Sequence, residues 1–256
     1  MRATLTASWT PRAGSDERQY EDAFYPRASG DRHARRLRFA IADGASESML
    51  SGLWADLLVR TWCKARRRRL PQIIEAASEF WEIELAAYLE DRERSERPIQ
   101  WFEEPGLEKG AFATLLGVSF NTGTHGTGTW RAASLGDTCL FHMRDGTLLT
   151  SFPMVSSADF DSRPKLVPSR PPDMSKVLSN LDETEGDWHS GDTFFLATDA
   201  VAAWFLNSAE GGLSPWKAWA GFDAASPHAY VDWVTEHRSN HELRNDDATV
   251  LRIDVR

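Results

Sequence analysis

The chain has 256 residues, of which 41% are hydrophobic, and a formal net charge of −9 at pH 7. This length and apolar content allow one large domain with a sizeable core. The acidic balance argues against nucleic-acid binding, which requires neutralisation of phosphates. The sequence shows neither an N-terminal apolar targeting segment nor a run of 18 apolar residues, so we expect a cytoplasmic protein with no membrane partner. Its two cysteines, Cys63 and Cys139, have no zinc-ligand spacing and form no disulfide framework.

The first part of the chain predicts short strands. Residues 3–9 alternate between apolar and polar, which is typical of a half-buried strand. Residues 21–25 can begin a second strand after a polar loop. The apolar run 37–42 predicts a buried strand that ends at Asp43-Gly44, where glycine permits a sharp turn.

A first helix is expected after this turn. Apolar residues recur at helical spacing over residues 47–65, and either Ser46 or Ser48 could cap the start of the helix. The basic run Arg66–Arg69 follows. It either complements the negative end of the helix dipole or docks a phosphopeptide.

Pro71 opens a second predicted helix, which runs to about Leu89 and is followed by a charged break over residues 90–98. The residues expected to face inward from this helix share its periodicity. They are Ile74, Phe80, Trp81 and Leu85.

The middle of the chain predicts a run of consecutive antiparallel strands. They are residues 111–120, 127–135, 138–143 and 147–152. Arg144-Asp145-Gly146 supplies a glycine-containing hairpin turn between the last two strands. Residues 153–190 are polar and rich in proline, so we expect an irregular, flap-like insertion there.

The last part of the chain returns to strands and helices. Residues 193–198 predict a strand that ends at Asp199, and residues 248–254 predict a final strand. Helices are expected at 200–208 and in parts of 214–238. Strands and helices do not alternate as they do in a parallel doubly wound sheet, so the order favours an α+β fold in which helices cover antiparallel sheets.

Four acidic motifs adjoin the ends of predicted strands. They are Glu21-Asp22, Asp43-Gly44, Asp199 and Asp246-Asp247. A fold that brings these ends together would set the carboxylates against one another, at ~4 kcal/mol per pair at contact distance for an effective dielectric near 20. Such a cluster needs a positive partner, and Mg²⁺ and Mn²⁺ are the cations that all-oxygen ligand sets prefer.

The motifs resemble those of the PPM-type, or type 2C, metal-dependent Ser/Thr protein phosphatases. Six stretches match in the family's order: Glu21-Asp22-Ala23-Phe24, Ala42-Asp43-Gly44, residues 110–114, residues 133–138, Leu196-Ala197-Thr198-Asp199 and Asp246-Asp247-Ala248-Thr249. The resemblance covers nearly the whole chain. It implies a single domain over residues 1–256 with a four-layer αββα sandwich, in which two antiparallel sheets carry helices on both outer faces, and with 153–190 as the flap-like insertion.

The resemblance also implies a metal site. Asp43 would bridge two Mn²⁺ or Mg²⁺ ions, and the Gly44 carbonyl would help to bind one of them. Asp199 and Asp246 would ligate the other ion. Asp137 matches the position that the family associates with a third, weaker ion.

Catalytic roles for neighbouring residues follow from the same resemblance. Glu21 and Asp22 would orient waters bound to the metal ions. Family members usually carry an arginine shortly before this pair to grip the phosphate, and Arg18 is the nearest candidate, with Arg12 behind it. A water activated by the two ions would attack phosphorus in line, and the seryl or threonyl oxygen would leave.

Two departures from the family pattern bear on activity. Residues 45–48 replace a stretch that often contains glycine or histidine, so a general-acid histidine is missing there. Ala200 stands where the family usually has glycine after Asp199, which costs about 1 kcal/mol if the backbone there has positive φ.

The expected function is therefore metal-dependent hydrolysis of phosphoserine and phosphothreonine on proteins, in opposition to a Ser/Thr kinase. The alternative is a catalytically weak or inactive PPM-like module that binds a phosphoprotein or a kinase. A metallohydrolase that acts on small phosphoesters stays open as a third possibility.

Overall fold

The computed structural model describes residues 1–65, 69–160, 164–171 and 173–256. Within these ranges the strands form two antiparallel sheets and one short pair. The first sheet has six strands in the order β3 (Gly30–His33), β1 (Arg2–Thr10), β13 (Ala248–Val255), β12 (Thr193–Ala197), β8 (Cys139–Arg144) and β9 (Thr147–Phe152). The second has five, in the order β11 (Asp182–His189), β7 (Thr127–Leu135), β6 (Leu115–Thr122), β4 (Arg36–Ala42) and β2 (Ala23–Tyr25). The pair joins β5 (Phe112–Ala113) to β10 (Val167–Pro168).

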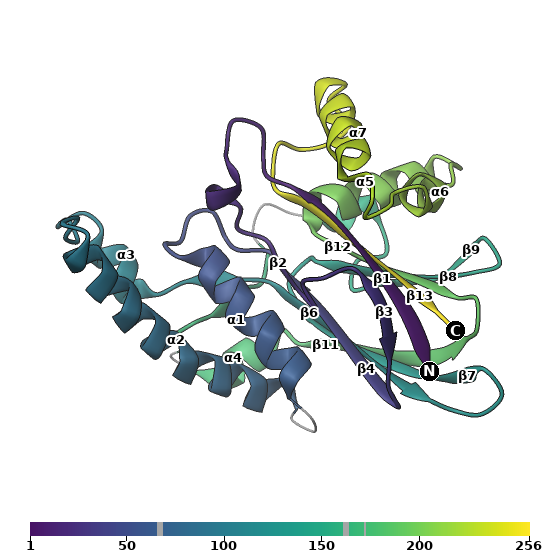
Figure 1. The fold of residues 1–256 in the computed structure, drawn as a ribbon, viewed down its shortest axis with the longest axis horizontal. Helices are drawn as coiled ribbons and strands as arrows, with labels where there is room; N and C mark the ends of the chain where they lie inside the picture. Colours follow the sequence, from purple (N-terminus) through teal and green to yellow (C-terminus); the bar gives the residue numbers. More distant parts are fainter. Residues whose placement is uncertain (66–68, 161–163, 172) are drawn as a thin grey trace.

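Helices cover both outer faces of the stacked sheets, so the predicted four-layer αββα sandwich is confirmed (Figure 1). On the second sheet lie α1 (Ser51–Lys64) and α2 (Leu70–Arg94), and on the first lie α5 (Asp199–Glu210), α6 (Pro215–Ala220) and α7 (Pro227–Ser239). Two shorter helices are α3 (Glu104–Lys109) and α4 (Met174–Leu178). In the described part of the chain, no helix combines the length and the apolar character needed to cross a lipid bilayer.

The interior between the sheets is filled by aromatic rings from facing strands. The Phe194 ring of β12 lies 4.8 Å from that of Phe120 and 5.6 Å from that of Trp130, both on the opposite sheet. These edge-to-face contacts suit the charge distribution of aromatic rings. Much of the aromatic content of the chain is therefore structural.

The predicted run of consecutive strands is divided between the sheets. β6 pairs with β7 and β8 pairs with β9, but β7 and β8 lie in different sheets. Asp145 and Gly146 both have positive φ, as a tight hairpin turn requires. The expectation that residues 153–190 are irregular is wrong for β10, α4 and β11, which lie within this range. Residues 182–189 form β11 because Trp188 is buried and the segment pairs with residues 127–134 of β7.

The helix predictions need three corrections. Neither Ser46 nor Ser48 caps α1, because Leu50 occupies the N-cap position without a side-chain hydrogen bond. The second helix extends past Leu89 to Arg94, into the segment predicted as a charged break. Phe80 does not face inward but is 51% exposed. Of the basic run 66–69, residues 66–68 lie outside the described ranges.

The contact between α1 and the second sheet depends on a glycine. Gly117 of β6 lies under the Trp62 ring of α1, and a Cβ atom added at this glycine would lie 2.1 Å from a ring carbon. The Trp62 ring therefore lies closer to the backbone of β6 than it could if residue 117 carried a side chain.

We predict that Gly117→Ala destabilises the protein by about 1–3 kcal/mol, because overpacking forces the Trp62 ring or the strand to move. Urea denaturation monitored by tryptophan fluorescence measures the free energy of unfolding. Gly211→Ala is the matched control, since its nearest contacts to an added Cβ begin at 3.4 Å. Equal stability of both variants would contradict the packing argument.

Candidate metal and phosphate site

Strand register places the segments that carry the acidic motifs together at one end of each sheet. Ala197 at the end of β12 pairs with Cys139 at the start of β8 and with Val250 near the start of β13. In the second sheet, Ala23 at the start of β2 pairs with Ala42 at the end of β4. The segments that carry the acidic residues therefore leave or enter their sheets side by side.

The charges of these residues act on one another across the two sheets. Burial raises the pKa of Asp43 well above its usual range. Further carboxylates raise it again, and they come from both sheets: Asp22, Asp199, Asp246 and Asp137. Burial, followed by the charges of Asp137 and Asp246, raises the pKa of Asp199 from its usual 3.8 to about 7. Five of the predicted acidic residues therefore lie near enough for their charges to act on one another: Asp22, Asp43, Asp137, Asp199 and Asp246.

Asp22 is the most clearly unsatisfied member of this group. Its side chain is 3% exposed, and its Oδ2 accepts hydrogen bonds from the hydroxyls of Thr198 at 3.0 Å and Thr249 at 2.6 Å. Oδ1 is buried and has no hydrogen-bond partner among the described residues. Burial raises the pKa of Asp22 well above its usual range, and the charge of Asp247 adds to the effect. An orphaned buried acceptor of this kind costs about 1–3 kcal/mol and fits a cation or a water held by one.

Threonine hydroxyls hold the backbone that carries the carboxylates. The Thr114 hydroxyl accepts the Asp43 N–H at 2.9 Å and pairs with the Thr138 hydroxyl at 2.6 Å. The Thr198 hydroxyl accepts the Thr249 N–H at 3.1 Å. Sequence reasoning gave these threonines no role. For Thr138, Thr198 and Thr249 the available signal was a threonine within two residues of an aspartate, in Gly-Asp-Thr, Ala-Thr-Asp and Asp-Asp-Ala-Thr, whereas Thr114 has no such signal.

Gly44 is required for steric reasons. A Cβ atom at this position would lie 2.7 Å from the Glu21 carbonyl oxygen and 2.8 Å from the Ser51 carbonyl carbon. The turn after Asp43 therefore packs directly against the backbone of the Glu21-Asp22 motif and of α1. This contact brings the two acidic motifs of the second sheet together.

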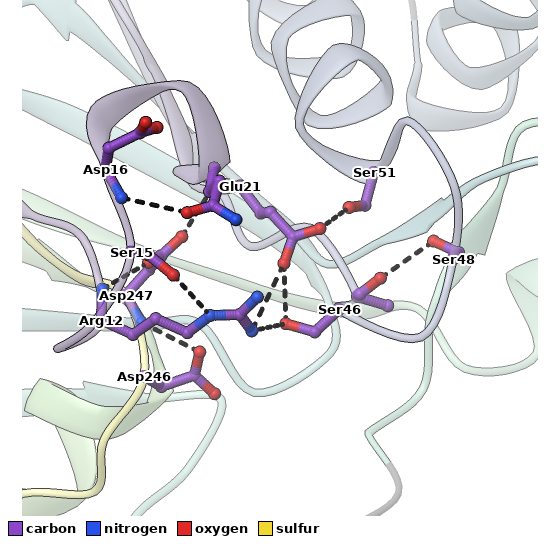
Figure 2. Close-up of polar contacts among 11 residues, drawn as sticks. Arg12, Ser15, Asp16, Glu21, Ser46, Ser48, Ser51, Asp246 and Asp247 are labelled. Atoms are coloured by element: carbon purple, nitrogen blue, oxygen red, sulfur yellow. Dashed lines mark hydrogen bonds and ion pairs between the residues drawn. The ribbon is translucent and has the colours of Figure 1, made fainter.

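Glu21 is held by hydroxyl groups and faces an arginine (Figure 2). Its Oε2 accepts a hydrogen bond from Ser46 at 2.7 Å, and its Oε1 accepts one from Ser51. The guanidinium of Arg12 lies 3.8 Å from Oε2 and donates to the Ser46 hydroxyl at 3.0 Å. Both Glu21 oxygens are thus engaged by the protein.

Of the two candidate phosphate ligands, Arg12 approaches the acidic motifs, whereas Arg18, the first candidate, turns away. Arg18 lies in a short 3-10 helix over Glu17–Gln19, pairs with Asp16 at 2.8 Å, and has a side chain that is 90% exposed. The chain folds back because Asp247 accepts both the Arg12 N–H at 2.8 Å and the Glu21 N–H at 2.6 Å. The candidate that lies farther from Glu21 along the sequence is thus the one that contacts it, and the phosphate contact expected for Arg18 stays a prediction.

The carboxylates do not form a closed set of ligands as they stand. Over residues 1–65, 69–160, 164–171 and 173–256, no three acidic, histidine or cysteine side chains lie close enough together to hold one ion. Asp199 accepts the Ala200 N–H and faces Arg244 at 3.8 Å. The chemistry of the site still fits hard cations, because all the candidate side chains offer oxygen and the orphaned Asp22 oxygen lacks a donor.

Ala200 needs no unusual backbone. It lies in the first turn of α5 and is not among the described non-glycine residues with positive φ. The cost expected for replacing glycine at this position therefore does not arise.

Comparisons with known proteins give structural neighbours but no sequence relatives. No family model matches the chain, and no curated protein matches it either. The serine/threonine phosphatase PstP/Ppp of Mycobacterium tuberculosis superposes with a TM-score of 0.59 at 13% identity, covering 100% of this chain and 99% of that one. The catalytic domain of PstP in complex with two manganese ions gives 0.54 at 14% identity, covering 99% of each chain. RsbX in complex with magnesium gives 0.53 at 13%, covering 100% of this chain and 96% of the other.

The chain therefore has the fold of the PPM-type Ser/Thr phosphatases, as its motifs implied. Identities of 13–14% make this a statement about the fold.

Asp199 gives a prediction for the metal-free protein. A carboxyl whose pKa is 3.8 when unfolded and about 7 when folded takes up a proton on folding. The contribution of Asp199 to the free energy of unfolding therefore falls as the pH rises from about 4 to about 7 and then levels off. We predict that Asp199→Asn raises this free energy by on the order of 2 kcal/mol at pH 7.5 and flattens its pH dependence.

Urea titrations in EDTA at several pH values between 4 and 8 measure this effect. Asp232→Asn is the control, because Asp232 is exposed on α7. A pH profile of Asp199→Asn that matches the wild type would rule out the assignment.

Proposed function

We propose that this chain is a Mn²⁺- or Mg²⁺-dependent phosphatase that hydrolyses phosphoserine and phosphothreonine on proteins. One observation carries the proposal: at one end of a PPM-type fold, burial together with the charges of carboxylates from both sheets raises the pKa values of Asp22, Asp43 and Asp199. Because like charges are costly where water is excluded, this arrangement needs cations. Neighbours named as Ser/Thr phosphatases, one of them in complex with two manganese ions, support the reaction class.

The proposed ligands for two ions share their position at the ends of the sheets. They are Asp43, the Gly44 carbonyl, Asp199 and Asp246, with Asp137 for a third ion. Glu21 would act through its hydrogen bonds to Ser46 and Ser51, since both its oxygens are engaged. Bound divalent cations would supply positive charge against the phosphate dianion and lower the pKa of a water.

The side chains around these ligands have distinct tasks. Asp22 has one free carboxylate oxygen among its described contacts, and with its raised pKa it can orient a water and hold its proton. Arg12 offers a planar guanidinium of the kind that binds phosphate oxygens in pairs. To do so it would exchange its contacts with Glu21 and Ser46 for contacts with the substrate.

The proposed partners are a phosphoprotein substrate and a Ser/Thr kinase acting in opposition.

A second candidate function is a PPM-like module that binds a phosphoprotein or a kinase without turnover. It is favoured by the absence of a closed ligand set among the described carboxylates. Comparing phosphopeptides with small phosphoesters as substrates separates protein phosphatase activity from a general phosphoesterase.

The first test is turnover of p-nitrophenyl phosphate by the purified chain. We predict activity with Mn²⁺, loss of activity in EDTA, and a fall in kcat of about 100-fold or more for Asp43→Asn, because several kcal/mol of charge stabilisation disappear. Asp187→Asn, which changes an exposed carboxylate of β11, is the control. Turnover that neither EDTA nor Asp43→Asn alters would refute the metal-dependent reaction. Absence of turnover with retained phosphopeptide binding would favour the binding module.

The second test compares two arginines of the same loop. We predict that Arg12→Met raises KM for a phosphopeptide about tenfold or more, because charge-assisted hydrogen bonds to phosphate contribute about 1.5–3 kcal/mol. Arg18→Met should leave KM unchanged, since its side chain is exposed and pairs with Asp16. Steady-state kinetics in saturating Mn²⁺ measures both, and the reverse order would reinstate Arg18 as the phosphate clamp.

A further inference from the structure

One arginine of α7 joins the two halves of the candidate site through their backbone. The guanidinium of Arg238 donates to the Pro11 carbonyl at 3.1 Å and to the Asp246 carbonyl. Pro11 precedes Arg12, the proposed phosphate ligand, and Asp246 is a proposed metal ligand. A single planar group on a helix outside the acidic motifs therefore contacts both.

The two segments that Arg238 joins are also bonded to each other. Asp247 accepts the N–H groups of Arg12 and Glu21, and the Asn245 side chain accepts the Ala13 N–H at 2.8 Å. Figure 2 shows Arg12 and Glu21 approaching Asp247 from the two ends of the loop. The loop between β1 and β2 thus rests on the turn that precedes β13.

The surroundings of Arg238 make its hydrogen bonds consequential. The residue is partly buried, and burial lowers the pKa of its guanidinium, while Tyr230, Asp247 and Asp246 act in the opposite direction. Both acceptors are backbone carbonyls, so the hydrogen bonds from Arg238 fix the position of the main chain at Pro11 and Asp246. Removal of the guanidinium would leave these carbonyls without this donor, at a cost comparable to a lost hydrogen bond each.

We propose that Arg238 is a positioning residue, which sets the place of Arg12 relative to Asp246 and so aligns the phosphate with the metal ions. This inference rests on the proposed function. The rigid fork of a guanidinium can span two fixed acceptors, whereas a lysine ammonium can hold one or the other from a flexible stem. We therefore expect Arg238→Met to disturb this alignment most and Arg238→Lys to disturb it less, relative to the wild type.

The experiment compares Arg238→Met and Arg238→Lys with Arg252→Met. Arg252 of β13 is a matched control, because its guanidinium also joins two backbone carbonyls, those of Ala220 and Phe222, and it belongs to none of the acidic motifs. Three quantities are measured: amide hydrogen exchange of residues 11–21 in the metal-free protein, Mn²⁺ affinity by titration calorimetry, and kcat and KM for a phosphopeptide.

For Arg238→Met we expect faster exchange of the Arg12 and Glu21 amides, Mn²⁺ affinity about tenfold weaker, and KM about tenfold higher, with kcat in saturating Mn²⁺ changed by less than about threefold. Arg238→Lys should recover part of each effect. Arg252→Met should lose stability without changing any of the three.

Matching results for Arg238→Met and Arg252→Met would overturn the inference. If Arg238→Met fails to fold, the test rests on Arg238→Lys. The inference would also be overturned if Arg238→Lys had the same amide exchange, Mn²⁺ affinity and KM as the wild type. If the wild type shows no turnover, the proposed function fails, whereas exchange and Mn²⁺ titration still decide whether Arg238 positions the loop.

Discussion

The structure depends on keeping several carboxylates together in a place from which water is largely excluded. Burial and mutual repulsion raise the pKa values of Asp22, Asp43 and Asp199. The protein opposes this repulsion with strand pairing in two sheets and with threonine hydroxyls that bond to Asp22 and to the Asp43 backbone. The rigid sheets thus hold together carboxylates that would move apart in a flexible chain. Their repulsion lowers the stability of the metal-free protein at the place where a cation would bind.

A second constraint is the return of the β1–β2 loop onto the turn before β13. The carboxylate of Asp247 bonds the two ends of the loop, Arg12 and Glu21, and Arg238 adds a support from α7. The motifs placed Asp247 beside the metal ligands, but its carboxylate accepts hydrogen bonds from the backbone N–H groups of the loop. The acids of the site differ in their contacts: both oxygens of Glu21 and of Asp247 accept hydrogen bonds from the protein, whereas Asp22 keeps one buried oxygen without a partner among the described residues.

Much of the fold could be predicted from alternation, apolar runs and helical spacing, because outer elements bury one face and central strands such as β6 and β8 bury both. The strands at β1, β4 and β13 and the helices α1, α2 and α5 appear close to their expected places. The division of β7 and β8 between sheets could not be predicted in this way, since both strands have the same local pattern. Phe80 shows the same limit: its spacing fits the inward face, but the neighbouring Trp81 takes the buried position.

For the site, the sequence by itself determined which acidic residues adjoin strand ends, that a glycine follows Asp43, and which family the motifs resemble. These follow from local order along the chain. That no larger residue fits at Gly44 follows only from its contacts with Glu21 and Ser51. Only the tertiary structure decided that Arg12 and not Arg18 approaches Glu21, that Asp247 bonds to the loop, and that Arg238 contacts both halves. The reason is physical: such contacts join residues up to 235 positions apart, and the register that places them is set by packing of whole sheets and helices rather than by any local pattern.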